Sequence, residues 1–186
     1  MIETNEEGFS LESMPDIGIL PRYVYRVNCT GIDATVSKSH NQMLVMDFEV
    51  LGPDPIEVDG KKYSTAGTKF RSWFVWTQSP QLKINCLALQ RGFGLPQRKY
   101  KNLADLQASI TEYMCENAVG STFMWRLYTE PQYKKEALTT AEIEAGKRQE
   151  DAPDLLDSNG EKILARHNVI APWSEIVGDY QRLQTA

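Results

Sequence analysis

The sequence is poor in the side chains from which metal sites and acid-base centres are built. Among 186 residues there are two histidines and three widely separated cysteines, Cys29, Cys86 and Cys115. No Cys-x-x-Cys or His-x-x-x-His pair occurs, so we expect neither a zinc site nor any other metal or cofactor. The odd number of cysteines, each within an apolar segment, predicts free, buried thiols rather than a disulfide framework.

Long apolar runs are absent as well. No stretch approaches the roughly 20 apolar residues that a helix needs to cross a bilayer. The first ten residues carry three glutamates and no basic residue. We therefore expect no membrane span, no secretory signal and a cytoplasmic location. Phosphate-binding loops of the Gly-x-x-x-x-Gly-Lys-Ser/Thr type and Gly-x-Ser-x-Gly elbows are also missing, which argues against two large enzyme classes.

The formal net charge of −5 is unevenly distributed along the chain. Residues 1–19 hold five acids and no base, residues 20–135 hold fifteen bases and ten acids, and residues 136–186 hold five bases and ten acids. A modestly basic body between two acidic segments permits contact with phosphates. We predict a flexible acidic arm at residues 1–16 and a single domain at residues 17–186, with a polar, acidic insertion at about residues 136–162.

Periodicity along the chain predicts a mainly β fold with helices. Alternating residues predict strands at 20–30, 43–51, 68–77, 121–130 and 162–170. Helical spacing predicts helices at about 80–93 and 103–117, and we expect a short C-terminal helix. Asp59-Gly60 predicts a two-residue hairpin turn. Three strands, a helical segment and two more strands is the element order of the five-stranded oligonucleotide/oligosaccharide-binding (OB) barrel.

The third predicted strand combines cations with an aromatic ring. With a period of two, Lys69, Arg71 and Trp73 share one face, opposite a row of aromatic residues that we expect to face the core. Such a face suits phosphate contacts and base stacking, although ordinary strand packing uses the same residue types. The predicted nucleic-acid-binding residues come from three strands and the loop at 37–42: Arg22, Arg26, Lys38, His40, Lys69, Arg71, Trp73, Arg126 and Tyr128.

Several segments resemble small phage-encoded single-stranded-DNA-binding proteins with OB-like barrels. The segments are Ile19-Leu20-Pro21, residues 37–50, the strand around Trp73, and Gly120-Ser121-Thr122-Phe123. The likeness covers roughly residues 17–135. The resemblance implies a strand-coating protein without catalytic activity, encoded beside DNA replication and recombination functions. It also implies that Lys38, Arg71 and Trp73 belong to the binding site.

On this interpretation the protein captures single-stranded DNA physically. Cations neutralise phosphates and rings stack on bases, so we expect steep weakening by salt and slight sequence preference. Such contacts do not exclude RNA as a ligand. We expect replication or recombination proteins as further partners. A homo-oligomer is also expected, because linking several binding sites on one strand increases affinity. The alternative is a β-barrel module for protein contacts or virion structure, because interfaces also favour Tyr and Trp. A Mg²⁺-dependent nuclease built on Asp47 and Asp59 is a minor alternative.

Overall fold

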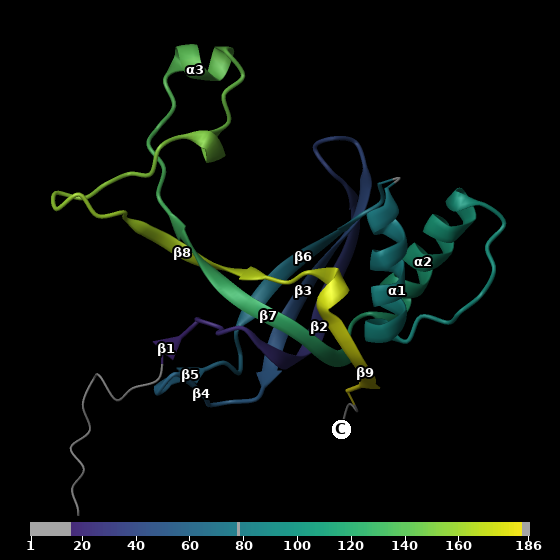
Figure 1. Ribbon diagram of the computed structural model, residues 1–186. Helices are drawn as coiled ribbons and strands as arrows, with labels where there is room; N and C mark the ends of the chain where they lie inside the picture. The colour runs from purple at the N-terminus through teal and green to yellow at the C-terminus, as the bar shows by residue number, and fades with distance from the viewer. Residues whose placement is uncertain (1–15, 78, 184–186) are drawn as a thin grey trace, which may run out of the picture. The chain divides into compact units, whose positions relative to one another are not determined.

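The chain forms two compact units, shown by a computed structural model that describes residues 16–77 and 79–183 (Figure 1). The first unit comprises the chain up to Tyr128 together with the segment from Ala171 onward, and the second comprises Thr129–Ile170. The predicted acidic arm at residues 1–16 lies outside the described residues except for Asp16. The insertion predicted at residues 136–162 falls within the second unit.

Five antiparallel strands form a nearly closed barrel. In chain order they are β2 (Tyr23–Val36), β3 (Gln42–Gly52), β6 (Lys69–Val75), β7 (Ser121–Tyr133) and β9 (Ile176–Arg182). The spatial order is β6-β3-β2-β7, and β9 pairs with the N-terminal part of β7. The indole Nε1 of Trp173, just before β9, donates a hydrogen bond to the backbone carbonyl of Trp73 on β6, at 3.1 Å. The prediction of a mainly β chain with an antiparallel five-stranded barrel is therefore confirmed.

The barrel core follows from the alternation of side chains along each strand. On β3, Leu44, Met46, Phe48 and Val50 are at most 1% exposed, while the residues between them are half-buried. β2 and β7 show the same alternation over their paired residues. Phe48 meets Trp125 of β7 edge-on, with 5.2 Å between ring centroids. Full burial of one large apolar side chain stabilises a fold by about 1.5–3 kcal/mol, so this aromatic centre is a main source of barrel stability.

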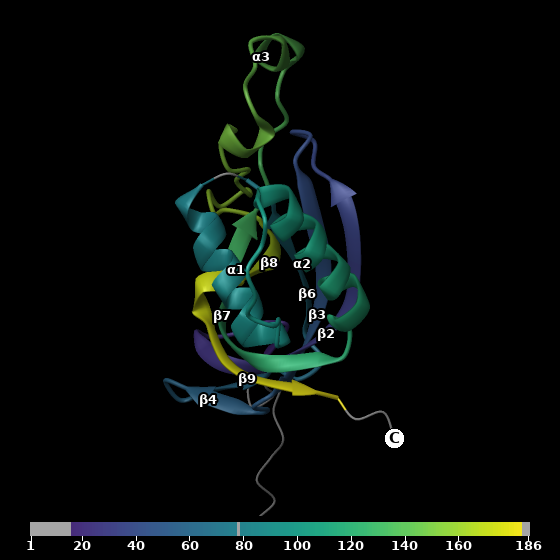
Figure 2. The ribbon, with the colours of Figure 1, turned by 90° about the vertical axis from the view of Figure 1, so that its right-hand side faces the viewer.

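Two helices separate β6 from β7 along the chain. They are α1 (Pro80–Phe93) and α2 (Leu103–Asn117), and they lie side by side (Figure 2). Gly94 ends α1 with a φ of 65°, a left-handed conformation that glycine adopts without steric cost. Asn102 caps α2, because its side chain accepts a hydrogen bond from the backbone N–H of Asp105 at 2.9 Å. Each helix buries part of its apolar surface, including Phe93 of α1 and Met114 of α2.

A small three-stranded sheet follows the end of β3. Its order is β1 (Asp16–Ile17), β5 (Lys61–Ser64) and β4 (Ile56–Val58). Asp59 and Gly60 connect β4 to β5 with φ angles of 51° and 76°. Two left-handed residues in succession give the mirror-image turn that matches the twist of a hairpin, so the predicted turn is confirmed.

The C-terminal part of the first unit differs from the sequence-based prediction. We expected a short helix after Pro172, but a single 3-10 turn, η3 (Trp173–Glu175), leads directly into β9. Gly178 and Asp179 have φ angles of 126° and 60°, which no right-handed helix contains. The edge of β7 offers unpaired backbone groups, and hydrogen bonding to that edge outweighs the local preference.

The second unit contains the remaining strand, β8 (Leu164–Ile170), which pairs with β7. The strand predicted at 162–170 is therefore present, but β9 and not β8 is the fifth strand of the barrel. The unit also contains α3 (Thr140–Glu144) and a 3-10 turn, η2 (Gln149–Asp151). Asp154 accepts hydrogen bonds from Lys135 at 2.6 Å and is 2.7 Å from the Lys162 ammonium, and these two cations lower the pKa of its carboxyl.

The three cysteines are free, but only one of them is fully buried. Burial raises the pKa of the Cys29 thiol to about 12. Cys86 is half-buried and Cys115 is exposed, so the prediction of buried thiols is wrong for Cys115, which is rotated away from its buried neighbour Met114 on α2. Within residues 16–77 and 79–183, no group of His, Cys, Asp or Glu side chains could hold a metal ion. No helix of these residues is long and apolar enough to cross a membrane.

Candidate nucleic-acid interface

The outer surface of β3 and β6 carries the most exposed tryptophan ring of the described residues. Trp73 is 53% exposed, and its neighbour Phe74 is fully buried, so the face predicted for Trp73 is confirmed. Trp73 lies opposite Val45 of β3, and the next row toward the hairpin pairs Val75 with Met43. We call the outward residues of these two strands the Trp73 face: Met43, Val45, Asp47, Glu49, Lys69, Arg71, Trp73 and Val75.

The backbone beneath the Trp73 ring is held in place. Its carbonyl accepts the hydrogen bond from the Trp173 indole, while its side chain points away from the core. On the inner side, Phe70 stacks on Phe48 with 5.2 Å between ring centroids. β6 therefore presents the Trp73 ring from a rigid wall, and a ligand that stacks on it need not order the strand first.

The cations of the Trp73 face lie opposite carboxylates of the neighbouring strand. Arg71 donates two hydrogen bonds to its cross-strand partner Asp47, at 2.7 and 3.2 Å. This contact lowers the pKa of the Asp47 carboxyl and raises the pKa of the Arg71 guanidinium. Lys69 lies opposite Glu49 in the same register. The carboxylates of β3 therefore share this face with the cations that the sequence predicted for it.

A second group of predicted residues lies on the outer surface of β2 and β7. The guanidinium of Arg22 sits 4.2 Å from the centroid of the Tyr128 ring, and this arginine already covers one face of that ring. Arg126 donates to Glu175 at 2.7 Å, and Arg26 is paired with Asp179. A hollow of about 660 Å³ opens here, which we call the arginine hollow, lined by Arg22, Tyr23, Val24, Pro53, Met124 and Arg126.

The remaining two predicted residues, Lys38 and His40, lie in the turn that joins β2 to β3. Both are exposed. The turn is closed by a hydrogen bond from the backbone N–H of Ser37 to the carbonyl of Asn41, at 2.7 Å, and His40 has a φ of 62°. The turn lies next to the Trp73 face, because Met43, the outward residue nearest to the turn on β3, belongs to that face.

The structure thus divides the nine predicted residues between two surfaces. Trp73, Arg71, Lys69 and the hairpin turn share one face, whereas Arg22, Arg26, Arg126 and Tyr128 surround or adjoin the arginine hollow. Sequence analysis did not single out Met43 and Val45, which flank Trp73. Their alternation with Leu44 and Met46 was the available signal, but it does not tell which face is inward.

The two acids of the nuclease alternative, Asp47 and Asp59, do not converge on one site. Asp47 is engaged by Arg71, and Asp59 occupies the turn between β4 and β5, in a different sheet. A comparison of the chain with protein-family models, with curated proteins and with solved structures finds no match.

Proposed function

We propose that this protein binds single-stranded DNA on the Trp73 face, without catalysing a reaction. The observation that carries the proposal is the half-exposed Trp73 ring, flanked by aliphatic Val45 and Met43 on a rigid barrel wall. Every base has a π-face, so such a ring stacks on a strand of any sequence. Lys38 and His40 at one end of the face and Lys69 and Arg71 at the other provide cations for phosphates along the strand.

The order of strand pairing supports the choice of this face. The first barrel strand, β2, pairs with the second, β3, and with the fourth, β7; the third, β6, pairs with β3, and the fifth, β9, pairs with β7. We propose that this barrel is an OB fold. OB folds bind oligonucleotides on the face of their second and third strands and on the adjoining loops. Those strands are β3 and β6 here, and the adjoining hairpin turn carries Lys38.

The ion pair between Arg71 and Asp47 does not prevent phosphate binding. The Arg71 and Asp47 side chains are 56% and 46% exposed, and an exposed pair of this kind contributes about 0–1 kcal/mol. A phosphate can therefore share the guanidinium, but Asp47 and Glu49 repel it at the same time. Stacking, rather than charge, is the main source of affinity under this proposal.

Titration with oligo-dT tests the function directly. We expect saturable quenching of tryptophan fluorescence, reported mainly by Trp73, because the other three tryptophans are at most 8% exposed. The affinity should fall with salt by an amount equivalent to roughly one to three phosphates, which is a log–log slope of about −0.7 to −2. No quenching at low salt would reject the proposal and favour a protein-contact module, for which a nearly neutral aromatic face is equally suited.

Removing the carboxylate beside Arg71 should strengthen binding. Asp47→Asn frees the guanidinium and removes one charge that repels phosphates. We expect tighter oligo-dT binding by roughly threefold to tenfold and a salt slope steeper by about 0.7, equivalent to one more phosphate contact. Glu57→Gln on β4 is the matched control, since it changes the net charge equally but lies outside the Trp73 face. Equal effects of the two variants would show that only net charge matters.

A further inference from the structure

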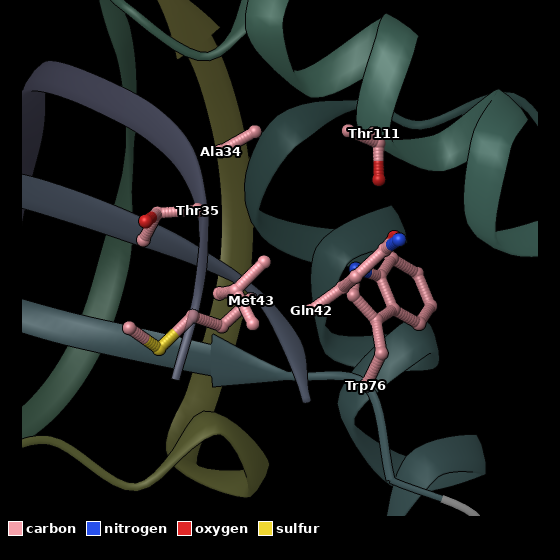
Figure 3. A pocket seen from close by; sticks show the side chains of 7 residues that line it. Ala34, Thr35, Gln42, Met43, Trp76 and Thr111 are labelled. Atoms are coloured by element: carbon pink, nitrogen blue, oxygen red, sulfur yellow. The ribbon is translucent and has the colours of Figure 1, made fainter. Parts of the chain in front are cut away.

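A hollow of about 220 Å³ lies between the β2–β3 hairpin and helix α2 (Figure 3). It is lined by residues 34–36 and 42–43 of the hairpin, by Trp76 after β6 and by Thr111 of α2. The hollow is smaller than the roughly 300–1,000 Å³ sites of drug-sized ligands. Its volume suits a single flat ring system, such as one nucleobase.

The hollow lies on the inner side of the hairpin. Val36 pairs with Gln42, and the backbone N–H of Trp76 donates to the carbonyl of Gln42 at 2.9 Å, so these three residues form one row across the strands. Figure 3 shows the side chains of Gln42 and Ala34 directed toward α2, and those of Thr35 and Met43 directed to the other side of the hairpin. The hairpin thus extends beyond the barrel core, and the hollow remains between it and α2.

The polar groups of the hollow are mainly donors. Gln107 of α2 donates to the side-chain oxygen of Gln42, which leaves the amide N–H groups of Gln42 to offer. Trp76 contributes an indole N–H, and Thr111 contributes a hydroxyl that both donates and accepts. Ala34 and Val36 supply aliphatic surface beside these groups. The set therefore suits a ring that carries carbonyl oxygens, one N–H and a methyl group.

We propose that this hollow holds one thymine base of the bound strand, an inference that rests on the proposed function. The carbonyl oxygens of thymine accept from Gln42 and Trp76, and its ring N–H donates to the Thr111 hydroxyl. Its methyl group packs on Ala34 and Val36, as apolar side chains do in other base contacts. Lys38, two residues beyond Val36, is exposed in the turn at this end of the hairpin and is the nearest cation in sequence for the adjoining phosphate.

Cytosine fits the same hollow less well. It has a single carbonyl oxygen, which accepts from one of the two donors, Gln42 or Trp76. Its amino group is itself a donor and would face the other of them without a partner. An unsatisfied polar group in a partly buried site weakens binding. We therefore expect the protein to prefer oligo-dT to oligo-dC by roughly tenfold, in contrast to the slight preference expected from stacking alone.

The test compares oligo-dT and oligo-dC of equal length at mildly basic pH, where cytosine is not protonated and oligo-dC does not pair with itself. In Gln42→Met the dT preference should fall to about twofold or less, since one of the two donors that distinguish a carbonyl oxygen from an amino group is gone. Gln97→Met is the matched control, as Gln97 is exposed between α1 and α2 and does not line the hollow, and it should keep the preference. Ala34→Phe, which fills the hollow, should abolish the preference, chiefly by lowering the affinity for oligo-dT.

Three results would overturn the inference. Tight binding of both strands without a dT preference removes the thymine site but leaves the proposed function standing. A dT preference that survives in both Gln42→Met and Ala34→Phe shows that the preference arises elsewhere. Absence of binding to either strand overturns the proposed function and this inference with it.

Discussion

Replacing Trp73 with alanine is expected to weaken oligo-dT binding by about tenfold to a hundredfold. One base stacked on an aromatic ring contributes roughly 1–3 kcal/mol, and Trp73 is the exposed ring at the centre of the proposed binding face. The loss should be similar on every sequence and at every salt concentration, because stacking depends on neither base edges nor counterions. Anisotropy of a labelled oligonucleotide measures it without relying on tryptophan emission.

The Trp73→Phe variant provides the control for this experiment. A phenylalanine keeps a stacking ring, so this variant should retain most of the affinity that alanine loses. Both variants should leave the fold intact, because the Trp73 side chain is more than half exposed and the hydrogen bond from Trp173 reaches the backbone carbonyl. Alanine and phenylalanine variants that bind like the wild type would place the binding surface elsewhere, with the arginine hollow as the next candidate.

The largest effect on stability is expected for Trp125→Ala. This ring is fully buried, and its Nε1 donates to the carbonyl of Pro172 at 2.7 Å. It lies 5.2 Å from the Phe48 centroid and 5.0 Å from that of Trp173, so it joins β7 to β3 and to the segment that closes the barrel. Truncation of a buried aromatic residue to alanine typically costs about 3–5 kcal/mol, a large part of the stability of an ordinary domain.

Urea unfolding followed by circular dichroism measures this loss as a shift of the midpoint. Trp73→Ala is the matched comparison, since it removes the same side chain from an exposed position and should cost less than about 1 kcal/mol. Trp125→Phe should fall between the two, because it keeps most of the apolar contacts but leaves the Pro172 carbonyl without its donor. Equal destabilisation by the two alanine variants would contradict the assignment of the barrel core.

Local patterns were sufficient for much of the fold. The alternation around Trp73 predicted which side of β6 faces the core, and helical spacing marked residues 103–117, where α2 begins and ends. Asp59-Gly60 predicted its turn because the hairpin turn needs two successive left-handed residues, and Asp-Gly adopts that conformation readily. Each of these features depends on residues that are close in sequence.

The features that sequence analysis missed depend on pairing between distant segments. Arg71 meets Asp47 only because β6 and β3 pair in one particular register, 24 residues apart. A bulge between Cys29 and Gly31 also reverses the alternation of β2, so Asp33 and Thr35 point outward although Cys29, of the same parity, is buried. β9 replaces the expected terminal helix for a similar reason, since the edge of β7 that it pairs with lies more than fifty residues earlier.

The hydrogen bond from Trp173 to Trp73 has a consequence for how this surface can change. The segment before β9 is joined to β6 through the backbone carbonyl of Trp73, and every amino acid has such a carbonyl. This hydrogen bond, which helps to close the barrel, therefore does not depend on which side chain stands at position 73. Many different residues at this position could therefore change the ligand preference of the proposed binding face without changing the barrel.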